Sequence, residues 1–165
     1  SSSIDYPETA MFRDRRLIQF LQRPAEYTHA VFSTALDPNV FVLRLVPGMR
    51  ADIIPLLEGR YRALVLESFG VGGLPGGDDG AMFAAVRDWC GAGHLAVFTT
   101  QVPHEGSDLA VYEVGRAAKA LPGVLEAHDM TPEATAVKLM WVLGQTTDRA
   151  EAEKLFLTPV QWDIL

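Results

Sequence analysis

The chain has 165 residues, of which 48% are hydrophobic and 21% are charged, and a mean hydropathy of +0.11; this balance predicts one soluble globular domain. Its formal net charge of −7 argues against nucleic-acid binding, which depends on clustered Lys and Arg side chains. A single cysteine, Cys90, cannot form an internal disulfide and indicates a reducing compartment, so we expect a cytoplasmic protein. No apolar run approaches the ~20 residues of a membrane span and no leader pattern opens the chain, so we expect neither a membrane anchor nor a signal peptide.

Residues 1–27 are interpreted as a leading segment or interdomain linker. They contain the densest basic group of the chain, which Asp14 interrupts and which we interpret as solvated surface: Arg13, Arg15 and Arg16. The folded core is predicted to cover residues 28–157.

Two short strands are predicted at the start of this core. Residues 28–33 and 40–46 are apolar runs, and the turn residues 37–39 separate them. Residues 50–58 then place their apolar side chains on one helical face, which predicts a helix, although Pro55 belongs near the start of one.

Buried strands and a helix alternate in the middle of the chain. Residues 63–66 form an unbroken apolar run, which is typical of a parallel strand covered on both faces. A glycine-rich loop over residues 70–80 leads into a predicted helix at 81–90. Residues 95–99 are expected to form a second buried strand.

A helix is predicted over residues 108–121, because six apolar positions share one stripe at a 3.6-residue period: Ala110, Val111, Val114, Ala117, Ala118 and Leu121. Leu109, Tyr112 and Arg116 lie on the opposite face of this helix. We expect that face to be left uncovered by the core and to support self-association.

Two further helices are predicted near the C-terminus. Thr131 and Pro132 form a helix start, with proline at the first helical position, before the nearly all-apolar stretch 134–143. Asp148 and Glu151 have the spacing of a capping box for a last helix that ends before residue 159.

Strands that alternate with helices at these spacings predict a small Rossmann-like, three-layer α/β domain, with a mostly parallel sheet of about four strands flanked by helices. In such sheets the ligand-facing loops leave the C-terminal ends of the strands. The loops at residues 67–77 and 99–107 meet this condition.

Three familiar motifs are incomplete in these loops. The third glycine of a dinucleotide-binding G-x-G-x-x-G that starts at Gly70 falls on Pro75. A zinc-protease interpretation of His104 fails because Asp108 occupies the second ligand position, and Ser107 lacks the G-x-S-x-G surroundings of a nucleophile. We therefore expect no metal and no dinucleotide cofactor.

Several stretches together resemble the smaller, C-terminal domain of L-asparaginases. Residues 63–75 read ALVLESFGVGGLP, residues 99–116 begin TTQ and end YEVGR, and residues 129–146 contain DMTPEAT, KLMW and LGQT. With the Pro-Gly-Met at residues 47–49, the resemblance spans about residues 40–157. The shared order and spacing make the combination specific.

The resemblance implies hydrolysis of L-asparagine to L-aspartate and ammonia through a threonine nucleophile, without a metal or organic cofactor. In the family, the nucleophile and its supporting Thr, Asp and Lys come from a larger N-terminal domain marked by T-G-G-T and H-G-T-D stretches. Neither stretch occurs in these 165 residues. We therefore expect residues 1–165 to be a C-terminal domain that holds no catalytic residue and is inactive without its N-terminal partner domain.

The resemblance also implies that this domain completes the active site of a neighbouring subunit in a dimer or tetramer. Gly72 and Gly73 match the loop where many relatives place an asparagine close to the neighbour's substrate, and Tyr112 is the best match to a second cross-subunit residue. Some type I, cytoplasmic-type relatives bind asparagine at an allosteric site, with an arginine at the position of Glu67 and groups around Thr100. Because a carboxylate at Glu67 repels the carboxylate of that ligand, we expect a vestigial site.

Two alternatives stay open. The asparaginase-like subunit of an archaeal-type glutamyl-tRNA(Gln) amidotransferase shares the Lys-Leu-Met-Trp stretch and releases ammonia for a partner enzyme. A non-catalytic α/β ligand-binding or scaffold domain keeps the fold without the chemistry. The codons that precede Ser1 discriminate between these possibilities, because they either encode a T-G-G-T domain or do not.

Overall fold

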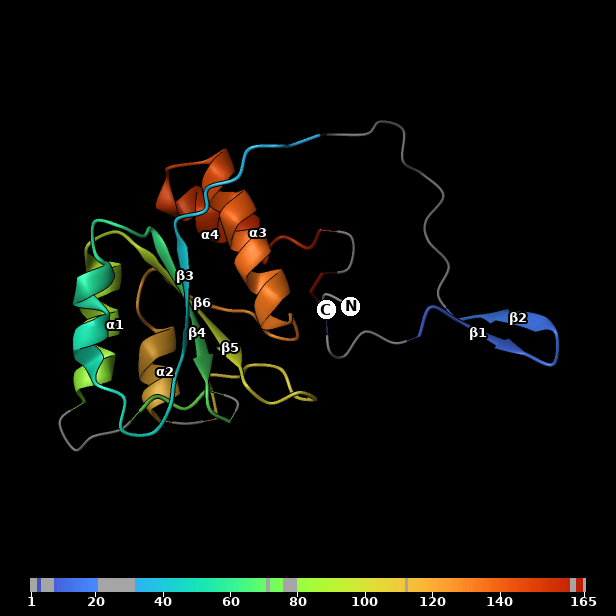
Figure 1. The fold of residues 1–165 in the computed structure, drawn as a ribbon, viewed down its shortest axis with the longest axis horizontal. Helices are drawn as coiled ribbons and strands as arrows, with labels where there is room; N and C mark the ends of the chain where they lie inside the picture. The colour runs from blue at the N-terminus through green and yellow to red at the C-terminus, as the bar shows by residue number, and fades with distance from the viewer. Residues whose placement is uncertain are drawn as a thin grey trace.

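A four-stranded parallel sheet forms the centre of the protein (Figure 1). The computed structural model describes residues 3, 8–20, 32–70, 72–75, 80–111, 113–160 and 163–164. The strands, in their order across the sheet, are β3 (Val40–Arg44), β4 (Ala63–Ser68), β5 (Leu95–Thr100) and β6 (Val124–Glu126). Every neighbouring pair is parallel, as predicted.

The two central strands are apolar because both of their faces are covered. All six residues of β5 are buried, and in β4 only Glu67 is partly exposed. Helices α1 (Ala81–Gly91) and α2 (Glu113–Lys119) pack on one face, whereas α3 (Pro132–Gln145) and α4 (Arg149–Leu157) pack on the other (Figure 1). The chain therefore has the predicted three-layer α/β architecture.

Side-chain caps fix where the last two helices begin. Thr131 Oγ1 accepts a hydrogen bond from the Ala134 N–H at 3.2 Å, directly before the proline that opens α3. Asp148 Oδ1 accepts from the Glu151 N–H at 2.8 Å, which confirms the predicted cap of α4. The return contact of a capping box is replaced, since the Glu151 carboxylate accepts from the Thr146 hydroxyl instead, at 2.7 Å.

Two of the predicted early elements differ in the structure. Residues 50–58 contain two short 3-10 turns, η1 (Ala51–Ile53) and η2 (Pro55–Leu57), instead of one α-helix. Pro55 has no N–H and its ring clashes with a preceding helical turn, so it begins a new turn. Of the strand predicted at 28–33, residues 28–31 lie outside the described residues, and Phe32 and Ser33 are not in a strand.

The helix predicted over residues 108–121 is shorter, because α2 begins only at Glu113. Leu109, which we assigned to the uncovered face, is fully buried. Val111 and Val114, which we assigned to the core stripe, are instead 53% and 48% exposed. Gly115 and Ala118 are the buried residues of α2, because this helix packs so closely that only small residues fit against the core.

The leading segment contains a hairpin that was not predicted. Strands β1 (Ala10–Arg13) and β2 (Arg16–Gln19) are antiparallel and stand apart from the α/β core (Figure 1). Asp14 and Arg15 form the turn with φ values of 50° and 62°, and every residue of both strands is exposed. Within the described part of the chain, no helix is long and apolar enough to cross a membrane.

Candidate functional site

A pocket of about 310 Å³ opens at the edge where the parallel strands end. Its walls come from the ends of β3, β4 and β5 and from the start of α3: Arg44, Glu67, Thr100, Gln101, Val102, Pro103, Met130, Thr131, Pro132 and Glu133. This edge is the one that strand-helix alternation predicts for ligands. The structure thus brings together Glu67 and Thr100, which the sequence places 33 residues apart.

The charges of this pocket belong to one arginine and two glutamates, which leaves a formal net charge of −1. Arg44 and Glu67 face each other across β3 and β4, with Nη1 3.5 Å from Oε2. The Arg44 side chain is 65% exposed and that of Glu67 only 15%. Because solvent screens the arginine more than the glutamate, the pocket favours cationic over anionic ligand groups.

The Gln101 side chain stabilises the same edge of the sheet, where the parallel strands end. Its amide Nε2 donates to the Leu45 carbonyl at 2.6 Å and to the Glu67 carbonyl at 2.8 Å, so one side chain ties together the ends of β3, β4 and β5. The role of Gln101 and the presence of Arg44 were both missed at the sequence level. The strand register, which pairs Arg44 with Glu67, reveals the arginine, and the hydrogen bonds of the Gln101 side-chain amide reveal the role of that residue.

The threonine hydroxyls at the end of β5 are not arranged as nucleophiles. Thr100 Oγ1 donates to the Gly70 carbonyl at 2.7 Å and accepts from the Val102 N–H at 3.0 Å. The Thr99 hydroxyl is buried without a hydrogen-bond partner, and no lysine lines the pocket to act as a base. Among the described residues, no group of three or more His, Cys, Asp or Glu side chains could hold a metal ion.

The glycine loop after β4 is closely packed. At Gly73 an added Cβ would lie 2.7 Å from the Phe69 carbonyl oxygen and 2.9 Å from its ring, in a turn closed by the Gly73 N–H to the Phe69 carbonyl at 3.0 Å. At Gly72 an added Cβ would lie 3.0 Å from the Asp108 carbonyl and 3.2 Å from Leu109 Cδ2. Local contacts therefore require glycine at residue 73, whereas a side chain at residue 72 would need its neighbours to shift by a few tenths of an ångström.

A buried carboxylate on β6 contacts both Leu109, which packs against the glycine loop, and Lys119, the last residue of α2. Glu126 is 5% exposed; its Oε1 lies 2.6 Å from Lys119 Nζ and its Oε2 accepts from the Leu109 N–H at 2.9 Å. The hydrogen bond from Lys119 to Glu126, reinforced by the opposite charge, raises the pKa of Lys119. Sequence analysis missed this contact, because a lone Glu at the end of a three-residue strand carries no signal of burial.

Tyr112, the predicted cross-subunit residue, lies outside the described residues. On either side of it in the sequence, Val111 and Val114 expose apolar side chains. The face predicted to self-associate therefore changes: Leu109 is in the core, and these two valines are at the surface.

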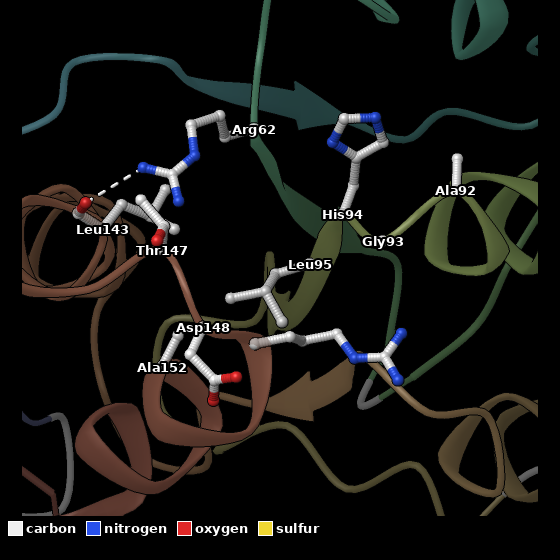
Figure 2. A pocket seen from close by; sticks show the side chains of 10 residues that line it. Arg62, Ala92, Gly93, His94, Leu95, Leu143, Thr147, Asp148 and Ala152 are labelled. Atoms are coloured by element: carbon white, nitrogen blue, oxygen red, sulfur yellow. Dashed lines mark hydrogen bonds between the residues drawn. The ribbon is translucent and has the colours of Figure 1, made fainter.

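A second pocket, of about 330 Å³, lies at the opposite edge of the sheet, where β4 and β5 begin (Figure 2). Arg62 and His94 precede these two strands, and Asp148 and Arg149 come from the start of α4. Figure 2 shows the Arg62 side chain pointing toward the Leu143 carbonyl, to which its Nη1 donates at 3.0 Å.

Arg62, one of the basic side chains that line this pocket, already has protein partners. Arg62 Nη1 also lies 2.8 Å from Asp37 Oδ2. Burial acts to raise the pKa of Asp37, but its hydrogen bonds with Arg62 and with the Asn39 N–H hold the pKa below its ordinary value. Arg62 therefore joins segments of the core at this edge.

Comparison with protein families identifies one domain. The Glutaminase/Asparaginase C-terminal domain matches residues 39–156. The L-asparaginase of Thermococcus kodakarensis is 38% identical over 154 residues, which are 93% of this chain and 46% of that protein. A glutamyl-tRNA(Gln) amidotransferase subunit of Metallosphaera sedula is 32% identical over 159 residues, which are 93% of this chain and 35% of that protein.

Comparison with solved structures supports the same relationship. The thermostable L-asparaginase from Thermococcus kodakarensis matches with a TM-score of 0.86 and 34% identity, over 98% of this chain and 48% of that one. L-asparaginase I from Vibrio cholerae shares the fold, with a TM-score of 0.75 and 22% identity, over 91% of this chain and 46% of that one. This chain spans about half the length of these L-asparaginases.

Proposed function

The chain belongs to the glutaminase/asparaginase C-terminal domain family, and from this premise we propose that it is the C-terminal domain of an enzyme that hydrolyses L-asparagine to L-aspartate and ammonia. The observation that carries the proposal is the similarity to the Thermococcus kodakarensis L-asparaginase along almost the whole of this chain, in sequence and in structure.

The catalytic groups of this enzyme come, in our proposal, from an N-terminal domain. Two of the three lysines are committed elsewhere: Lys119 pairs with Glu126, and Lys138, which is 7% exposed, pairs with Asp163 at 2.8 Å. The Thr99 hydroxyl is unpaired and the Thr100 hydroxyl is bound to a backbone carbonyl, and no lysine base lines the pocket beside either of them. A chain that spans about half of its L-asparaginase relatives leaves room for the missing groups.

The hairpin supports the same partner domain. An isolated two-stranded hairpin is at best marginally stable in water. The facing residues Phe12 and Leu17 are 74% and 68% exposed, and the facing Met11 and Ile18 alternate with them on the other side of the hairpin. Both sides therefore need a cover, which we assign to the N-terminal domain. Proteolysis should cut the hairpin rapidly in the 165-residue chain and slowly in the full-length enzyme.

We assign the Gly72–Gly73 loop and Tyr112 to the substrate site of a neighbouring subunit in a dimer or tetramer. The exposed apolar pair Val111 and Val114 supports a contact on this side of the domain. Val114→Glu should shift sedimentation toward 18.1 kDa particles. Val137→Glu, at a 60% exposed valine on α3, is the matched control and should leave association unchanged.

The gene gives the simplest test of the proposal. The codons immediately before Ser1 are expected to encode a domain with T-G-G-T and H-G-T-D stretches. Alanine replacement of the T-G-G-T threonine nucleophile should abolish ammonia release from asparagine. An upstream region without these stretches would contradict the assignment.

A second candidate is the asparaginase-like subunit of a glutamyl-tRNA(Gln) amidotransferase, which the 32% identity over 93% of this chain favours. In that case ammonia would serve a partner enzyme. The purified full-length protein, assayed with asparagine and without tRNA or partner, separates the two. Efficient turnover supports the asparaginase, whereas turnover that requires the partner enzyme and tRNA supports the amidotransferase.

Cys90 supports a cytoplasmic location, which is also part of the proposal. It is a free, buried thiol, and a reducing compartment keeps such a thiol unmodified. Cell fractionation in the source organism tests this location.

A further inference from the structure

We propose that Glu126 is a positioning residue, which acts through Leu109 to hold the glycine loop after β4 and helix α2 in a fixed relation. The inference rests on the proposed function, because these are the two elements assigned above to the neighbouring subunit's substrate site. Glu126 itself contacts no substrate in this proposal.

The Glu126 carboxylate joins both ends of the α2 region. Glu126 is buried, so each of its oxygens must be hydrogen-bonded or paired to offset the loss of water. One oxygen lies 2.6 Å from Lys119 Nζ and the other accepts from the Leu109 N–H at 2.9 Å. Lys119 is the last residue of α2, and Leu109 precedes its first residue by four positions. A single side chain on β6 therefore holds the chain before α2 and the end of α2.

Leu109 is the residue against which both functional elements pack. It is fully buried. An added Cβ at Gly72 would lie 3.2 Å from its side chain, and one at Gly115 would collide with its carbonyl oxygen. Helix α2 thus approaches Leu109 as closely as only a glycine allows, and the glycine loop packs against the Leu109 side chain. A displacement of Leu109 must shift both.

The position of Leu109 also determines where the proposed substrate-facing groups lie. Helix α2 begins four residues after Leu109, and residue 73 follows Gly72 directly. A displacement of Leu109 would therefore move any substrate-facing group on α2 or in the glycine loop. A displacement of about 1 Å in a positioning group can cost as much as 100-fold in rate. The carboxylate accordingly controls substrate contact without taking part in the chemistry.

Two variants of graded severity test the proposal in the 165-residue chain. Glu126→Gln keeps a buried acceptor of nearly the same shape but loses the ion pair. Lys119→Gln removes the charge of the partner whose side chain is 52% exposed, but its amide can still donate a hydrogen bond to Glu126. Glu58→Gln, at an exposed residue between η2 and β4, is the control. Hydrogen exchange of residues 109–119 and 72–75 should speed up by about tenfold or more in the two variants, with β4 and β5 unchanged.

The full-length enzyme supplies a readout that a merely structural role would not move. Because the nucleophile is assigned to the other domain, Glu126→Gln should raise KM for asparagine about tenfold and leave kcat within about twofold. Unchanged exchange in residues 109–119 for both variants overturns the positioning role, even when the enzyme is active. An inactive wild-type enzyme instead overturns the proposed function, and the exchange measurement still decides whether Glu126 holds Leu109.

Discussion

Arg44 and Glu67 are paired on neighbouring parallel strands and form an ion pair at the mouth of the pocket, with Nη1 and Oε2 3.5 Å apart. The pocket thus contains an arginine, but this arginine lies on β3 and not at position 67, where the resemblance places an arginine in some relatives. It lies beside a glutamate that is far more buried than itself. The pocket of this chain is therefore poorly suited to the carboxylate of an amino-acid effector.

We expect Glu67 to prevent allosteric activation by asparagine. The rate of the full-length enzyme should follow asparagine concentration hyperbolically, in the wild type and in Glu67→Ala, because the net charge of −1 in the pocket disfavours a carboxylate. Steady-state kinetics would check this, with Glu58→Ala as the control. A sigmoidal wild-type curve that becomes hyperbolic in Glu67→Ala would show that the pocket binds effector.

Gly73→Asn should destabilise the domain by about 1–3 kcal/mol, because its Cβ would meet the Phe69 carbonyl and ring within 2.9 Å. Gly91→Ala is the matched control, since an added Cβ there meets nothing within 4 Å and the residue lies in α1. That change should stabilise the domain by up to about 1 kcal/mol. Urea unfolding measures both, and equal stability of Gly73→Asn and wild type would contradict the packing argument.

Cys90 should react with iodoacetamide only when the domain unfolds. Burial raises the pKa of its thiol to about 11, so at pH 8 only about one thiol in a thousand is the reactive thiolate, and the side chain is 2% exposed. Labelling followed by mass spectrometry should therefore be slow in buffer and fast in urea. Complete labelling of the folded chain within minutes would refute the burial of Cys90.

The Asp37–Arg62 ion pair should make folding sensitive to acid. The pKa of Asp37 is lower in the folded state than in the unfolded state. The Asp37 carboxylate therefore stabilises the fold at pH values above its unfolded pKa of about 3.9. This stabilisation is lost as the pH falls through the pKa of the folded state. The destabilisation caused by Asp37→Asn should thus be larger at pH 7 than at pH 3. A difference that stays constant between these pH values would argue against the pair.

The sheet and its principal helices follow from local patterns. Strands β4 and β5 are continuous apolar runs because helices cover both faces of the sheet. Thr131 and Pro132 predict the start of α3. The hairpin was missed because apolar residues stand side by side, as in Met11-Phe12 and Leu17-Ile18, and show no alternation.

The site was predicted less completely than the fold, because its contacts join residues far apart in the chain. Glu67 and Thr100 were expected to be close, and the pocket contains both. The contact of Glu126 with Leu109 spans 17 residues, and no periodicity signals it. The stripe that placed Val114 in the core failed because Gly115 sets the packing distance of α2.

The most direct test of the central claim is ammonia release from L-asparagine by three samples: the 165-residue chain, the full-length enzyme, and full-length Tyr112→Ala with Tyr112→Phe beside it. The chain alone should show no turnover, because the threonines at the end of β5 have no lysine base beside them. The full-length enzyme should be active, and Tyr112→Ala should lower its rate by up to about 100-fold. An unaffected Tyr112→Ala enzyme would remove only the role of that residue, whereas turnover by the purified 165-residue chain would contradict the assignment of catalysis to another domain.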